Sequence, residues 1–389
     1  MLLVGARQVG KSTLIKHEFR DFNRANFDDR LTRMQAKEEP KLFLLNNPQP
    51  LFIDEVQKES SILEDIKQIV DESDERGMFI LSGSQKLELM KGMSESLAGR
   101  VSISELTGLS MREIYGVKFN RHFIPTDAYI KEREKEIVKY DNIWEIIHKG
   151  SYPELYDIDR DWQEYYSSYV ATYLERDINE LVAADGITFT KFLTAVAART
   201  GELLNYSNIA GDVGVSEPTI KNWISILERT GIVYLLQPYS ASALKRAIKT
   251  PKLYFRDTGL ACYLTRWLTA DTLKCSAVAG NMFETFVVSE ILKSYSNEGK
   301  DYRFNIFYYR GKDRNASGEN EIDLVIEEDG VLYPVEIKMS GNPKASMGAT
   351  NQVLDKVSDK KRGLGVILCL IDKKTYLREN LVALPIEFI

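Results

Sequence analysis

Acids and a lysine alternate with apolar residues in the segment EIDLVIEEDGVLYPVEIKMS, which runs from residue 321 to 340. Asp329-Gly330 predicts a two-residue type I′ hairpin turn, because that turn needs a positive φ at both central positions. With this turn, the two-residue period of a strand places Asp323 opposite Glu336 on one face. The other face is expected to be apolar and to carry Ile322, Leu324, Ile326, Tyr333, Val335 and Ile337.

Two opposed carboxylates repel each other, since directly paired side chains on adjacent strands lie about 5 Å apart at Cβ. Asp323 and Glu336 therefore need a cation between them, and a hard divalent ion such as Mg²⁺ suits carboxylate oxygens. The alternative is a solvent-exposed face, on which Glu321 and Lys338 form a weak ion pair worth about 0–1 kcal/mol. The spacing alone leaves both interpretations open.

A helix before the hairpin supplies a third acid. The segment GNMFETFVVSEILKSY, residues 280–295, has helical periodicity, and Glu284 lies on its apolar face. A carboxylate on an apolar face is costly unless it is paired or binds a metal. Glu284 is therefore a third candidate metal ligand beside Asp323 and Glu336.

The amino-terminal residues carry a different chemistry. GARQVGKS, residues 5–12, matches G-x-x-x-x-G-K-[ST] between a short apolar strand and a helix, which is the context that this motif requires. Its glycines let backbone N–H groups surround phosphate oxygens, and the helix N-terminus adds its positive dipole end. Lys11 is expected to reach the β- and γ-phosphates, and the Ser12 hydroxyl to hold Mg²⁺. The complete nucleotide-binding prediction in this segment comprises Gly5, Gly10, Lys11, Ser12 and Thr13.

Two further strands end in polar residues. LFIDE, residues 51–55, places Asp54 where it suits Mg²⁺ and Glu55 where it suits polarisation of the attacking water. The strand at 78–85 offers Ser82 or Ser84 as a γ-phosphate contact, although a simple strand-to-loop turn explains both serines equally well. Three such strands predict a parallel sheet with its ligand at the carboxyl edge, and hence ATP binding and hydrolysis.

Arg100 is the candidate arginine for the γ-phosphate, in cis or from a neighbouring subunit. A surface ion pair explains Arg100 equally well, and a homo-oligomer is expected only through this arginine and by analogy with AAA-type proteins. Only four residues precede Gly5, so we expect the natural chain to begin earlier.

Residues 205–236 have the pattern of a winged helix-turn-helix. Ser207 and Ser216 are expected to cap two helices on either side of Gly214, and a strand follows from residue 232. A protein-docking or structural module is the alternative, because the second helix carries little net positive charge. The predicted DNA contacts are Thr219, Lys221 and Asn222 on that helix and Lys245, Arg246 and Lys249 in a basic run that continues to Lys252 and Arg256.

The whole chain has 389 residues and an ordinary globular composition, with 44% hydrophobic and 28% charged residues. Its net charge of −6 argues against a globally basic nucleic-acid binder. Three scattered cysteines form no metal or disulfide pattern and favour a reducing cytoplasm, and no apolar run reaches the length of about 20 residues that a membrane span needs.

The order helix-Glu, Asp, Glu-x-Lys resembles the PD-(D/E)XK nuclease superfamily. The resemblance implies that Asp323 and Glu336 hold Mg²⁺, that Lys338 positions or activates water, and that Glu284 completes the site. The proline that usually precedes the aspartate is Ile322 here.

End to end, the chain also resembles a large, mostly uncharacterised family of bacterial and archaeal AAA-type predicted ATPases. The residues that carry this resemblance include GARQVGKST, LFIDEVQ, SLAGR, GSYPE, PKLYFRDTGLACYL, FETFVVSE and YPVEIK. The resemblance implies an α/β multidomain chain with a P-loop domain (1–116), a helical linker or lid (117–185), a winged helix (186–256) and a restriction-endonuclease-like domain (257–389).

The sequence therefore predicts an ATPase that uses ATP and Mg²⁺, binds DNA and couples nucleotide state to a nuclease-like domain. Two alternatives stay open. The nuclease-like domain is non-catalytic and only docks DNA or protein, or the chain is a transcriptional regulator that uses the winged helix alone.

Overall fold

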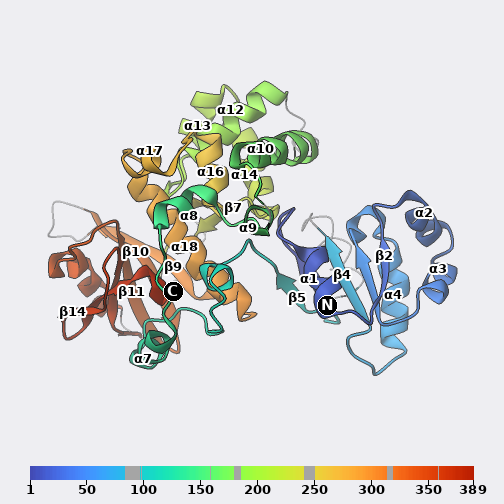
Figure 1. Ribbon diagram of the computed structural model, residues 1–389, viewed down its shortest axis with the longest axis horizontal. Helices are drawn as coiled ribbons and strands as arrows, with labels where there is room; N and C mark the ends of the chain where they lie inside the picture. The colour runs from blue at the N-terminus through green and yellow to red at the C-terminus, as the bar shows by residue number, and fades with distance from the viewer. Residues whose placement is uncertain are drawn as a thin grey trace. The chain divides into compact units, whose positions relative to one another are not determined.

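The computed structural model describes residues 1–83, 97, 99–157, 159–178, 185–240, 250–312, 319–357 and 359–389 (Figure 1). Two compact units make up the chain: Met1–Gly108 with Leu227–Ile232, and Leu109–Ile226 with Val233–Ile389. The fold is α/β and multidomain, with a parallel five-stranded sheet, a helical middle and a mixed carboxyl-terminal sheet. No helix among the described residues is both long and apolar enough to span a membrane.

The first unit contains a parallel sheet with the strand order β2-β3-β4-β1-β5. Strands β1, β3 and β4 are buried throughout, because their apolar side chains pack into hydrophobic clusters on both faces of the sheet. The strands are β1 (Leu2–Val4), β2 (Asn23–Asn26), β3 (Leu51–Asp54), β4 (Phe79–Gly83) and β5 (Ile103–Glu105). The helices are α1 (Lys11–Glu18), α2 (Arg30–Glu38), α3 (Pro40–Asn46), the 3-10 turn η1 (Val56–Glu59) and α4 (Ile62–Asp71). The three strands predicted from their polar ends are thus neighbours in one parallel sheet.

The helical middle opens the second unit. Its helices are α6 (Met111–Ile114), α7 (Asp127–Arg133), η2 (Glu134–Glu136), α8 (Ile143–Lys149), α9 (Glu154–Asp157), α10 (Trp162–Tyr169), the π-helical η3 (Val170–Ile178), α12 (Gly186–Ala197), α16 (Thr258–Leu264) and α17 (Ala270–Lys274). Aromatic residues of α10 form its buried face, since Tyr165, Tyr166 and Tyr169 are each almost fully buried.

The two helices and the strand predicted within residues 205–236 are present as α13 (Tyr206–Val213), α14 (Glu217–Arg229) and β7 (Val233–Leu236). Gly214 takes the left-handed conformation that ends α13. The expected cap at Ser207 is wrong, because Asn205 accepts the capping hydrogen bond from the Asn208 N–H instead. Ser216 accepts the predicted bond from the Thr219 N–H at the start of α14. Strand β7 pairs with β8 (Lys252–Phe255) in a sheet ordered β6-β8-β7, in which β6 is Glu202–Leu203.

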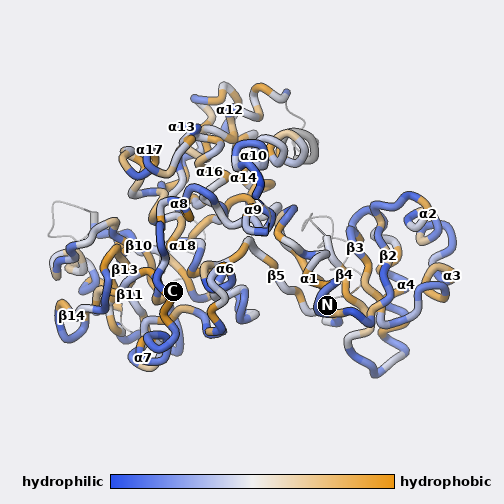
Figure 2. The backbone as a smooth tube through the Cα atoms, viewed as in Figure 1, coloured by the Kyte–Doolittle hydropathy of each residue, from blue (hydrophilic) through white to orange (hydrophobic). Residues whose placement is uncertain are grey.

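The carboxyl-terminal sheet is mixed, with the order β14-β15-β13-β11-β10-β9 and with β12 beside β11. Figure 2 shows hydrophobic residues concentrated along β10, β11 and β13. The strands are β9 (Ile306–Lys312), β10 (Glu319–Glu328), β11 (Val331–Lys338), β12 (Lys361–Arg362), β13 (Gly365–Cys369), β14 (Thr375–Arg378) and β15 (Leu381–Pro385). The helices are α18 (Ala279–Asn297) and the 3-10 helices η4 (Tyr302–Phe304), η5 (Ala345–Lys356) and η6 (Ile386–Phe388).

The hairpin between β10 and β11 has the predicted turn, and its register is as predicted from the turn out to the pair of Leu324 and Val335. Asp329 and Gly330 both have positive φ, and Leu324 pairs with Val335. The prediction that Ile322 lies on the same face as Leu324 is wrong, because Ile322 packs in a core cluster with Val325. A register shift between Ile322 and Val325, where β10 pairs with β9, breaks the simple alternation.

Candidate functional sites

The loop between β1 and α1 carries both glycines of the predicted phosphate-binding motif. Gly10 has a left-handed conformation, and α1 begins at the next residue. A side chain at Gly5 would bring its Cβ to 2.2 Å from the Leu106 carbonyl oxygen, so only glycine fits there. Lys11 is buried and donates from Nζ to the Gly5 carbonyl (3.0 Å) and the Ala6 carbonyl (2.8 Å). Burial lowers the pKa of Lys11 to about 8, although nearby Glu55 and Asp54 act to raise it.

The predicted magnesium ligands lie together at the carboxyl ends of the strands. The Ser12 hydroxyl donates to Asp54 Oδ2 at 2.6 Å, and the hydroxyl of fully buried Ser82 donates to Asp54 Oδ1. Glu55 follows directly, in a left-handed conformation that is costly for a residue with a side chain, and Gln57 donates to its carboxylate. Thr13 is exposed on α1, and Ser84 lies outside the described residues.

Arg100 makes a surface ion pair. Its guanidinium donates from Nε and Nη2 to the carboxylate of Asp71, the last residue of α4, and the two side chains are each 39% exposed. This contact matches the surface interpretation of Arg100.

A second group of charged residues lies in the other unit, and we call it the acidic centre. Its carboxylates come from α18 (Glu284), β10 (Glu321 and Asp323) and β11 (Glu336), and its lysines from β8 (Lys252) and β11 (Lys338). Asp323 and Glu336 are 7% and 3% exposed. The alternative of a solvent-exposed face is therefore wrong.

Lys338 lies between the two opposed acids. Its Nζ is 2.8 Å from Asp323 Oδ2 and 2.9 Å from Glu336 Oε2, and the Ile337 N–H donates to the same Asp323 oxygen at 2.8 Å. The cation that the repulsion required is thus supplied by the chain itself.

Lys252 pairs the remaining two acids. Its Nζ is 2.6 Å from Glu321 Oε1 and 3.2 Å from Glu284 Oε1, and the Tyr254 hydroxyl also donates to that Glu284 oxygen at 2.6 Å. The expected Glu321–Lys338 pair is therefore replaced by Glu321–Lys252. The predicted DNA-facing basic run is wrong at Lys252, because this lysine is buried within the acidic centre. The alternation of Lys252 and Tyr254 along β8 is the signal for a shared polar face.

Burial and neighbouring charges shift the pKa values of four residues of the acidic centre. Burial and the charge of Asp323 raise the pKa of Glu284, and the same two causes raise the pKa of Glu336 to about 8. Burial acts to lower the pKa of Lys252 and of Lys338, but the surrounding carboxylates raise both above the ordinary value. Both lysines therefore remain charged at neutral pH.

The acidic centre fits Mg²⁺ in the chemistry of its oxygen donors, and Glu336 Oε1 is buried without a hydrogen-bond partner. However, no group of three or more His, Cys, Asp or Glu side chains among the described residues is arranged to hold a metal ion. The structure brings Glu284, Asp323 and Glu336 into one electrostatic cluster, and lysine ammonium groups hold their oxygens.

The predicted DNA contacts have mixed placements. Lys221 and Asn222 are exposed on α14, where Lys221 pairs with Glu217 at 2.8 Å, and Thr219 is half-buried. Lys245, Arg246 and Lys249 lie outside the described residues.

Asp257 connects by hydrogen bonds two segments that carry the family resemblance, GSYPE and FRDTGLACYL. Its Oδ2 accepts from the Ser151 N–H (2.6 Å) and hydroxyl (2.9 Å), and its Oδ1 accepts from the Tyr166 hydroxyl and the Leu260 N–H (both 2.7 Å). Because four donors satisfy this buried carboxylate, Asp257 is a structural anchor.

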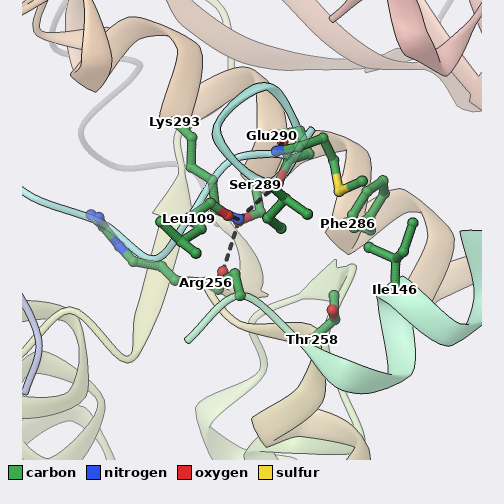
Figure 3. Close-up of a pocket in the computed structure, with 12 residues that line it drawn as sticks. Leu109, Ile146, Arg256, Thr258, Phe286, Ser289, Glu290 and Lys293 are labelled. Carbon is green, nitrogen blue, oxygen red and sulfur yellow. Dashed lines mark hydrogen bonds and ion pairs between the residues drawn. The ribbon is translucent and has the colours of Figure 1, made fainter. Parts of the chain in front are cut away.

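A small pocket beside α18 is lined by a buried ion pair between Glu290 and Lys293 (Figure 3). Lys293 Nζ donates to Glu290 Oε1 at 2.8 Å and to the Leu109 carbonyl at 3.0 Å, and Glu290 Oε2 accepts from the Met111 N–H. Both side chains are buried, so this pair is also structural.

Three family models each match one stretch of the chain. Residues 1–115 match the model of an AAA domain, residues 140–271 a domain of unknown function (DUF8612), and residues 279–389 a domain of unknown function (DUF4143). The AAA match indicates a nucleotide-binding ATPase domain at the amino terminus.

Two mycobacterial relatives cover most of the chain. They are the uncharacterized proteins Mb2031c of Mycobacterium bovis and Rv2008c of Mycobacterium tuberculosis, each 27% identical over 365 residues, which is 91% of this chain and 74% of theirs. The crystal structure of protein VC1899 from Vibrio cholerae aligns over 99% of this chain and 94% of its own at 12% identity, but its TM-score of 0.20 supports no conclusion.

Proposed function

We propose that the chain binds and hydrolyses ATP with Mg²⁺ at the loop between β1 and α1. The supporting observation is the contact of 2.6 Å between the Ser12 hydroxyl and Asp54 beside buried Lys11. In this proposal Lys11 exchanges its carbonyl partners for phosphate oxygens, Ser12 and Asp54 hold the metal, and Glu55 polarises water. Bound Mg²⁺ would neutralise charge that develops on the phosphate oxygens.

Steady-state ATP hydrolysis tests this proposal. Glu55→Gln should lower kcat by about 100-fold or more while ATP still binds, because it removes a general base. Lys11→Ala should abolish ATP binding. Lys16→Ala is the matched control, since Lys16 is an exposed lysine of the same helix. Full hydrolysis by Glu55→Gln would contradict the assigned role.

We further propose that the ATPase binds DNA and couples its nucleotide state to a Mg²⁺-dependent nuclease-like domain at 257–389. The clustering of Glu284, Asp323, Glu336 and Lys338 supports this role. Residues 117–185 would act as a linker or lid and 186–256 as a winged helix, with Thr219, Lys221, Asn222, Lys245, Arg246 and Lys249 contacting DNA. The test is nicking of plasmid, junction and single-stranded DNA with Mg²⁺, compared with a Glu336→Ala, Lys338→Ala variant. Full cleavage by that variant would exclude this site.

A second candidate function is a nucleotide-switched module that binds DNA or protein without cleaving it. The observation in its favour is that Lys252 and Lys338 hold carboxylate oxygens that a metal would need. Absence of cleavage with every divalent metal, together with nucleotide-dependent DNA retention, would select this function.

If Arg100 acts from a neighbouring subunit, ATPase turnover per chain should rise with protein concentration, and a constant turnover would contradict that role.

A further inference from the structure

The ammonium group of Lys252 lies inside the acidic centre rather than at its edge. The side chain is 4% exposed and contacts one carboxylate from α18 and one from β10. Lys338, in contrast, is 35% exposed. Lys252 is therefore the more enclosed of the two cations, and it comes from a different sheet, that of β6, β8 and β7.

We propose that Lys252 is a resident cation that competes with a divalent metal for the acidic centre. Metal binding then requires the ammonium group to leave Glu284 and Glu321. This inference rests on the proposed Mg²⁺ site but names a residue and a competition that the site alone does not imply.

Charge explains the competition. Four carboxylates face two ammonium groups, and Glu284 Oε1 already accepts from Lys252 and Tyr254. A divalent ion placed near Lys252 would meet like charge at short range in a poorly solvated site, where charges interact more strongly than in water. Withdrawal of Lys252 removes that repulsion and releases Glu284 Oε1 and Glu321 Oε1 together.

A groove beside Lys252 offers the displaced side chain a place to go. The groove is open to solvent, has a volume of about 680 Å³ and is lined by Lys252, Glu321, Arg310, Thr250 and the first turn of α13. Lys252 itself lines this groove, so its ammonium group can turn from Glu284 toward the groove.

Binding of Mn²⁺ to the nucleotide-free full-length chain tests the competition. Lys252→Met keeps much of the side-chain volume and removes the charge, so it should bind Mn²⁺ about tenfold tighter or more. Lys252→Arg keeps the charge and should bind no tighter than the unmodified chain. Lys293→Met is the matched control, since Lys293 is a buried lysine that pairs with another α18 carboxylate. Thermal melting establishes that each variant is folded.

The unmodified chain provides a measurement that does not depend on a variant's folding. Lysine acetylation followed by mass spectrometry should show Lys252 protected without metal and reactive at saturating Mg²⁺, with Lys293 protected in both states. Continued protection of Lys252, or unchanged Mn²⁺ affinity in folded Lys252→Met, would overturn the inference.

Glu336→Ala separates this inference from the proposed nuclease function. If Glu336→Ala abolishes Mn²⁺ binding but Lys252→Met leaves it unchanged, the metal site stands and the role of Lys252 fails. If Lys252→Met binds Mn²⁺ tighter and no DNA is cleaved, the competition stands and the nuclease function fails.

Discussion

The buried carboxylate of Asp257 stabilises the fold through four hydrogen bonds, in each of which it is the acceptor. Two N–H groups and two hydroxyls point at its two oxygens. An amide at this position turns an NH₂ group toward at least one donor. We therefore expect Asp257→Asn to lower the free energy of unfolding by about 2–3 kcal/mol, measured by urea denaturation.

Asp185→Asn is the matched control for this prediction. Asp257 is the N-cap of α16, where its carboxylate accepts from the Leu260 N–H. Asp185 is likewise the N-cap of α12, where its carboxylate accepts from the Thr188 N–H. Because asparagine caps helices about as well as aspartate, the change should be within about 0.5 kcal/mol. Equal losses in the two variants would show that only the cap matters at Asp257.

At the residue scale, strand periodicity predicted that Asp323 and Glu336 lie near each other, and both acids contact Lys338, but it did not predict all of the partners of the acids. The repulsion between Asp323 and Glu336 followed from strand periodicity, and the need for a cation followed from the repulsion. Lys252 and Glu321 belong to different strands and different sheets, so no local spacing pairs them. The same limit applies to Arg100 and Asp71, which are 29 residues apart.

At the scale of elements, the turn between β10 and β11 sets the pairing of the two strands out to Leu324 and Val335. Gly330 has φ +77, a conformation that side chains rarely adopt. Gly330→Ala should lower the free energy of unfolding by about 1 kcal/mol, measured by urea denaturation. Asp329→Asn should have little effect, because asparagine tolerates the left-handed conformation. A neutral Gly330→Ala would show that the turn does not limit hairpin stability.

Elements were predictable where one local rule determines them. Buried parallel strands read as apolar runs, and Asp329-Gly330 set the register of the hairpin. The register shift near Ile322 was not predictable, because it arises where β10 pairs with β9 rather than from the local pattern of β10. Capping by Asn205 instead of Ser207 reflects a choice between two good capping residues two positions apart.

At the scale of the whole molecule, the chain places its two charged sites in different compact units. The phosphate-binding loop lies within Met1–Gly108, and the acidic centre lies within Leu109–Ile226 and Val233–Ile389. Coupling between them therefore needs a nucleotide whose binding free energy differs between two states of the chain. The net charge of −6 makes DNA retention a demanding readout, since only local positive charge can support it.

Under the proposed coupling, retention of DNA should depend on nucleotide state. We expect a non-hydrolysable ATP analogue with Mg²⁺ to change the Kd for a fluorescent DNA duplex by about 5-fold or more, measured by anisotropy at constant salt. Lys11→Ala should remove the difference between the two nucleotide states, because its loop no longer holds phosphate. Lys16→Ala should keep it, since Lys16 is exposed on the same helix and outside the motif. A nucleotide effect that persists in Lys11→Ala would mean that the coupling does not pass through the phosphate-binding loop.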